Sequence, residues 1–119
     1  MLHPSLQGLI WDTHTHVFGA PERYPLVPTR GYTPPVRWID QLAKTSAAAG
    51  VNHLVMVHPS VYGLDLSALI DALAAGGGKY RGVAVIPPDT STARFAELHR
   101  VGVRALRFNL VSVAGTSFD

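Results

Sequence analysis

The pattern that most constrains the fold is a threefold repeat of a helix, a glycine and an apolar strand. Apolar residues at helical spacing end at Gly50, at the triple glycine 76–78 and at Gly102. Each stop is followed by a mostly apolar run, which is typical of a strand covered on both faces. One more such run precedes the first helix, so the predicted order is βαβαβαβ. Repeated units of this length predict four parallel strands with right-handed crossovers.

The bounds of these elements follow from turn and cap residues. We predict strands over residues 9–13, 51–57, 80–86 and 103–110, and helices that start at Thr33-Pro34-Pro35, at Asp65 and within 89–92. In the third helix, Phe95, Leu98 and Val101 are expected to point inward. Residues 1–8 are predicted to be a disordered lead-in, and 17–33 a long irregular loop of the kind that often binds ligands.

Four strands amount to half of a (β/α)8 barrel, which takes about 250 residues. No glycine-rich fingerprint follows the first strand, which argues against a dinucleotide-binding sheet. The 119 residues are therefore interpreted as one partial barrel domain, 1–119. In such barrels the active site lies at the carboxyl ends of the strands.

The amino-acid composition excludes several classes of function. The chain is 47% hydrophobic and 15% charged, which is typical of a globular core. Its net charge of +2 favours neither nucleic acid nor a membrane as partner, and we expect a cytoplasmic protein. It contains no cysteine, which excludes a thiol nucleophile and a thiolate metal site.

Chemistry-bearing side chains follow the first strand, in the run LIWDTHTHVFG. Side chains alternate along a strand, so Asp12, His14 and His16 are predicted to share one face. Imidazole binds metals and donates hydrogen bonds to anionic oxygens. Asp12 is predicted to orient a histidine, although an ordinary polar residue at a strand end would look the same.

Polar groups also lie at or near the ends of the second and fourth strands. Arg107 and Asn109 share a face of the fourth strand, and an arginine holds a carboxylate with two hydrogen bonds. Arg104 would point inward in the opposite phase, and Arg107 could also serve in a surface ion pair. Ser60 and Tyr62 follow the second strand and are candidates for substrate contact. Turn capping by Ser60 and packing by Tyr62 remain open alternatives.

Four segments together carry a family resemblance. WDTHTHVFG, HPSVYGLD, YRGVAVI and GVRALRFNLV, in this order, resemble the lactonase-like branch of the amidohydrolase superfamily. The resemblance implies a distorted (β/α)8 barrel that hydrolyses a lactone or related ester of a carboxylated small molecule. It implies that His14 and His16 are catalytic and bind one divalent metal such as zinc, or contact the substrate in a metal-independent version. It places Arg107, and Ser60 less directly, against a substrate carboxylate.

The chain lacks counterparts of the family's later histidines and of its aspartate base. We therefore expect an incomplete part of a hydrolase that is inactive by itself. Open edges on the first and fourth strands predict pairing with another chain, such as a second copy. The alternatives are a metal-dependent decarboxylase of the same superfamily and a non-catalytic half-barrel that binds an anion or dimerises.

Overall fold

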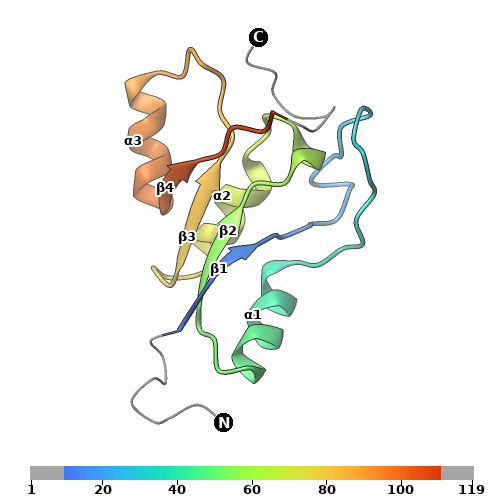
Figure 1. The fold of residues 1–119 in the computed structure, drawn as a ribbon, viewed down its shortest axis with the longest axis vertical. Coiled ribbons are helices and arrows are strands. Elements are labelled where there is room, and N and C mark those ends of the chain that lie inside the picture. Colours follow the sequence, from blue (N-terminus) through green and yellow to red (C-terminus); the bar gives the residue numbers. More distant parts are fainter. Residues whose placement is uncertain (1–9, 111–119) are drawn as a thin grey trace.

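A computed structural model describes residues 10–110. It contains one sheet of four parallel strands in the order β1-β2-β3-β4, so the predicted architecture is confirmed (Figure 1). The strands are β1 (Trp11–Thr15), β2 (His53–Val57), β3 (Tyr80–Ala84) and β4 (Val103–Leu106). The predicted lead-in, 1–8, lies outside the described residues.

Helices connect the strands as the repeat predicts. They are α1 (Ile39–Ala48), α2 (Ser67–Ala74) and α3 (Thr92–Val101), and a short 3-10 helix, η2 (Ser60–Tyr62), follows β2. The helix stops are confirmed at Gly50 and Gly102, whose φ angles of 83° and 120° lie in the region that favours glycine. The start of α2 is held by Asp65, whose Oδ1 accepts from the Ser67 amide at 2.9 Å.

The predicted start of α1 at Thr33 is wrong. Residues 33–37 are not helical, because Arg37 exchanges two backbone hydrogen bonds with Phe18, at 2.8 and 2.9 Å. The helix begins only after Trp38, whose amide donates to the side chain of Gln41. A tertiary contact to the chain after β1 thus overrides the local signal of a capping hydroxyl and two prolines.

The main core lies between the sheet and its helices. Leu54 and Met56 of β2 are at most 1% exposed and pack with buried residues of α2 and α3. At Gly82 of β3, a side chain would meet Leu73 Cδ1 of α2 at 2.8 Å, so glycine permits close approach of the helix. The buried members of this cluster are Val17, Ile39, Leu54, Met56, Leu66, Leu69, Ala72, Leu73, Ala84, Ile86, Leu98 and Val103.

A second, smaller cluster anchors the long loop. Tyr24 is 6% exposed, stacks on Trp38 with ring centroids 4.9 Å apart, and donates its hydroxyl to Asp71 Oδ2 at 2.7 Å. Val61 and Tyr62 of η2 complete the buried layer. The loop is therefore a packed part of the fold that runs beside the carboxyl ends of β1 and β2.

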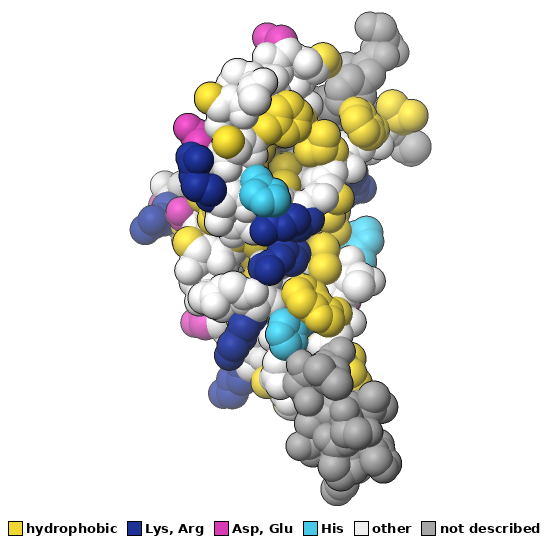
Figure 2. Space-filling model, turned by 90° about the vertical axis from the view of Figure 1, so that its left-hand side faces the viewer, with side chains coloured by type: hydrophobic (Ala, Val, Ile, Leu, Met, Phe, Trp, Pro, Cys, Tyr) yellow, Lys and Arg dark blue, Asp and Glu magenta, His cyan; other side chains and the backbone are white. Residues whose placement is uncertain are grey.

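The outer edge of β4 differs from the rest of the molecule. Phe95 was predicted to point inward, but it is 42% exposed, and Leu106 is 37% exposed. With Leu98, Val103 and Arg104 they line an open groove of about 410 Å³ between α3 and β4. Figure 2 shows this side of the molecule, where hydrophobic side chains lie next to a group of basic ones. Among the described residues, no helix has the length and apolarity needed to cross a membrane.

Candidate active site

A bulge in β1 decides which residues of the Asp12–His16 run face the site. Trp11 pairs with His53 and Asp12 with Leu54, but the next pair is Thr15 with Met56. Two residues of β1 thus stand opposite one of β2, which interrupts the alternation of side chains.

The prediction that Asp12, His14 and His16 share one face is therefore wrong for Asp12. In register, Asp12 stands beside Leu54, which belongs to the helix-covered face. Its Oδ1 accepts a hydrogen bond from the His14 backbone amide at 3.1 Å. Asp12 thus shapes the backbone at the bulge, and its recorded contact with His14 is to the main chain and not to the ring.

His14 and His16 do come together. Thr15 and Val17 are buried toward the core, so the alternating residues His14 and His16 lie on the opposite face. Their ring centroids are 5.1 Å apart in an edge-on arrangement. The two imidazoles therefore form one polar group where β1 ends.

The orientation of His16 is fixed by a backbone carbonyl. Its Nδ1 lies 2.7 Å from Val57 O, at the end of β2. A carbonyl oxygen only accepts, so Nδ1 carries the hydrogen and Nε2 of the neutral ring keeps its lone pair. Burial lowers the pKa of His16, and the charges of His14 and Arg107 lower it further, against the Val57 hydrogen bond, which raises it. At pH 7 this ring is therefore a neutral acceptor.

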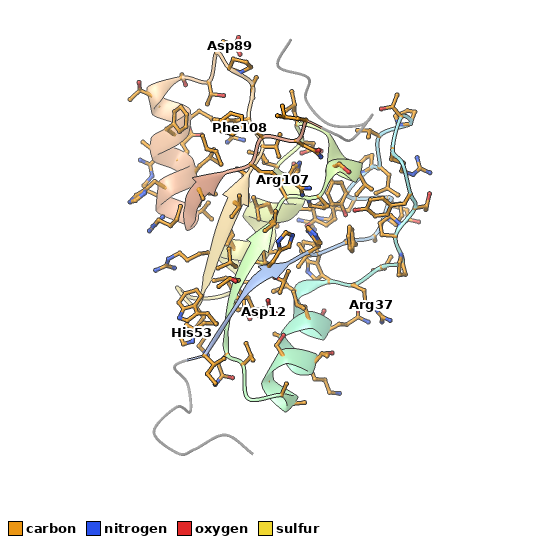
Figure 3. All side chains as sticks on the ribbon, in the orientation of Figure 1. Asp12, Arg37, His53, Asp89, Arg107 and Phe108 are labelled. Atoms are coloured by element: carbon orange, nitrogen blue, oxygen red, sulfur yellow. The ribbon has the colours of Figure 1, made fainter. Side chains whose placement is uncertain are left out.

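Arg107 comes from the other edge of the sheet and lies at the same carboxyl ends of the strands as the two imidazoles. We call this end of the sheet the rim. Arg107 follows β4 directly, and its amide donates to Ala84 O at 2.8 Å, which continues the pairing with β3. Its Nη1 donates to His58 O at 3.4 Å, and its charge acts on His16, His58 and Tyr32. Figure 3 shows Arg107 at the opposite end of the sheet from His53. The guanidinium and the imidazoles thus meet at the carboxyl ends of the strands.

Arg104 takes the other side. Its Nη1 donates to His99 O at 2.7 Å, at the end of α3. The alternation along the fourth strand therefore separates the two arginines, with Arg107 toward the rim and Arg104 against the helix. The strand itself is shorter than predicted, so Arg107 and Asn109 lie beyond its end.

Ser60 and Asn109 are both half-buried near this rim. Ser60 opens η2, two residues after His58, and Asn109 follows Arg107 by two. Both residues remain predicted substrate contacts.

Tyr62 does not fit its predicted role. It is 2% exposed in the second cluster, and its hydroxyl accepts from the Gly19 amide at 3.0 Å. The packing alternative is the better description of Tyr62, because its ring and hydroxyl hold the chain after β1 against η2.

The structure places two further residues at the rim, Tyr32 and His58, for which the sequence gave little indication of a role in the site. Tyr32, in the long loop, is 48% exposed, stands edge-on to Phe18 with centroids 6.4 Å apart, and lies within electrostatic reach of Arg107. His58 is 1% exposed and follows β2 directly. Its position at a strand end before a proline was the available signal.

The rim is rich in hydrogen-bond donors and poor in available carboxylates. Asp12 binds the backbone of His14, and Asp65 accepts from both the amide and the hydroxyl of Ser67. The charge of Arg107 suits an anionic oxygen, whereas the free Nε2 of His16 suits a hydrogen-bond donor. Within residues 10–110 no three His, Cys, Asp or Glu side chains are grouped so that they could hold a metal ion.

Comparison with known proteins gives consistent matches. The family described as Amidohydrolase matches residues 11–119. The chain is 40% identical over 100 residues to a 2-pyrone-4,6-dicarboxylate hydrolase of Comamonas testosteroni, covering 84% of this chain and 33% of that protein. It is 37% identical over 98 residues to a 4-sulfomuconolactone hydrolase of Hydrogenophaga intermedia, covering 82% and 32%.

Among solved structures, a candidate 2-pyrone-4,6-dicarboxylic acid hydrolase from Pseudomonas putida superposes with a TM-score of 0.74 at 34% identity. The superposition covers 85% of this chain and 37% of the other. The chain thus spans about a third of the length of the curated relatives it matches.

Proposed function

The chain belongs to the amidohydrolase family, and from this membership we propose that it forms the substrate-carboxylate side of a hydrolase that opens a lactone. The substrate class is a cyclic ester of a carboxylated small molecule, and the reaction is attack of water on the ester carbonyl. Both curated relatives described above are named as hydrolases, one of a lactone and one of a pyrone dicarboxylate.

One observation carries the proposal: Arg107 and the His14–His16 pair lie over the same end of the sheet. Arg107 lies close enough to lower the pKa of His16, and the two imidazoles are 5.1 Å apart. A guanidinium beside two imidazoles can bind a carboxylate at one end of a small ring and face its carbonyl at the other.

Each residue of this rim then has a separate role in binding or hydrolysis. Arg107, with Ser60 and Asn109 beside it, holds the substrate carboxylate. His16 is a neutral acceptor at Nε2, so it orients a donor such as the attacking water. His14, which is exposed, completes the polar wall that faces the ester carbonyl, where negative charge develops during attack. Tyr32 covers the Arg107 side from the long loop.

The predicted metal does not have a complete site in the described part of this chain. His14 and His16 supply two ligands, whereas zinc sites take at least three from protein. We therefore derive no step through a metal, and the proposed roles rest on hydrogen bonding and charge alone. The decarboxylase alternative has no specific support, because the named relatives are hydrolases.

Binding by Arg107→Ala tests the proposal, with Arg104→Ala as the matched control. The probes are 2-pyrone-4,6-dicarboxylate and its uncharged dimethyl ester, measured by isothermal titration calorimetry. A hydrogen-bonded charge contributes about 1.5–3 kcal/mol, so Arg107→Ala should weaken dicarboxylate binding roughly 10- to 100-fold. Arg104→Ala should change it less than about twofold, because Arg104 binds the end of α3.

The comparison of the charged and the uncharged probe decides whether Arg107 binds the substrate carboxylate. The ester should bind Arg107→Ala and the unaltered chain alike. Equal losses for the charged and uncharged probes would show that Arg107 only supports the fold. A chain that binds neither probe would overturn the proposed substrate class.

A further inference from the structure

The ring of His58 makes a contact that none of the roles above uses. The residue follows β2 directly and is 1% exposed. Its Nε2 lies 2.7 Å from Gly63 O, so Nε2 carries the hydrogen and donates it. Nδ1 then holds a lone pair, which is buried and has no hydrogen-bond partner within the described residues. Burial of a polar atom without a hydrogen bond costs free energy.

The ring closes the turn that contains Ser60. Gly63 has φ +57°, a conformation that side chains rarely adopt, and in it the carbonyl accepts from His58. Between these two residues lies η2, which begins at the half-buried Ser60. The turn is also tied to the long loop, because the Val27 amide donates to Val61 O at 2.8 Å.

The backbone carbonyl of His58 accepts a hydrogen bond from Arg107. Arg107 Nη1 donates to His58 O at 3.4 Å. The ring of His58 thus holds Gly63, whose amide closes the turn by donating to Ser60 O at 3.0 Å, and the carbonyl of His58 accepts from Arg107.

We propose that His58 is a positioning residue that fixes the distance between the Ser60 hydroxyl and the Arg107 guanidinium, so that both reach one carboxylate of the substrate. This inference rests on the proposed function. A neutral ring is required, since an imidazolium would repel Arg107. Burial lowers the pKa of His58, the Gly63 hydrogen bond and Asp65 oppose this effect, and Arg107 and His16 add to it.

Two amide variants test the role of the ring. In His58→Gln the amide nitrogen reaches about as far as Nε2 and can donate to Gly63 O. In His58→Asn the same group stops one bond short. We expect His58→Asn to weaken binding of 2-pyrone-4,6-dicarboxylate about tenfold and His58→Gln to stay within about threefold of the unaltered chain, since the lost interaction is one hydrogen bond that orders a charged site.

The matched measurements separate positioning from general stability. The dimethyl ester should bind both variants equally, and in an Arg107→Ala background His58→Asn should cause a smaller loss than it does alone. If His58→Asn does not fold, nitrogen NMR of the unaltered chain provides the second test. The His58 ring should show a protonated Nε2 and a bare Nδ1, and its signals should shift when the dicarboxylate binds but not when the ester does.

The outcomes are distinct. An unaltered chain that does not bind the dicarboxylate overturns the proposed function and this inference with it. Normal binding by the unaltered chain, with equal affinities for His58→Asn and His58→Gln or with unmoved His58 signals, overturns the inference alone.

Discussion

The rim at the carboxyl ends of the strands and the outer edge of β4 are built in opposite ways. At the rim, three polar side chains are fixed by backbone carbonyls: His16 by Val57, His58 by Gly63 and Arg107 by His58. At the edge, Phe95 and Leu106 are apolar and more than a third exposed.

The difference shows what this chain provides by itself. The rim groups are ordered by bonds within residues 10–110, so their geometry is a property of this segment. At the edge, the described residues leave apolar side chains partly exposed, which is typical of a surface made for contact. The predicted pairing of open strand edges, with a second copy or other polypeptide, remains a prediction at this edge.

The largest expected effect is on stability, and it comes from α3, where a core residue and a residue of the exposed edge lie one turn apart. Leu98 is 2% exposed and Phe95, one turn earlier, is 42% exposed. Leu98→Ala should lower the free energy of unfolding by about 2–5 kcal/mol, because it leaves a cavity. Phe95→Ala should cost less than about 1 kcal/mol, because solvent already reaches the ring. Urea denaturation measures both, and similar losses would mean that the groove is part of the core.

The next effect concerns the support of the rim. Tyr62→Phe keeps the ring but leaves the buried Gly19 amide without its acceptor. The free energy of unfolding should fall by about 1–3 kcal/mol. Affinity for 2-pyrone-4,6-dicarboxylate should stay within about twofold, since Tyr62 does not face the ligand. A selective loss of affinity with unchanged stability would restore Tyr62 as a substrate contact.

The smallest effect is a pH dependence of stability that comes from the rim. The pKa values of His16 and His58 are both lowered below 6.5 in the folded chain, mainly by burial. The unfolded chain therefore binds more protons, so stability is complete above pH 6.5 and decreases as the pH falls through the folded pKa values. Melting temperatures between pH 7.5 and 5.5 check this, above the range in which carboxylates titrate. His58→Gln should show a weaker dependence, and an unchanged slope would contradict the assignment to His58.

Much of the fold follows from local pattern. The repeat of helix, glycine and strand predicts the parallel sheet and its order, because each signal acts within one turn or one strand. The same pattern places His14 and His16 after the first predicted strand and Arg107 in the last part of the fourth, and parallel strands bring their carboxyl ends together. The helix stops at Gly50 and Gly102 were predictable because a positive φ is a local demand on one residue.

The sequence by itself thus determined the alternation of elements and the rim on which the imidazoles and the guanidinium meet. Only the tertiary structure decided that a bulge turns Asp12 away from the face of His14 and His16 and that α1 begins after Trp38. It also decided that Tyr62 is buried and that Phe95 is exposed to solvent. The physical reason is that periodicity reports which side chains share a face, whereas burial and register depend on which distant segment packs against that face.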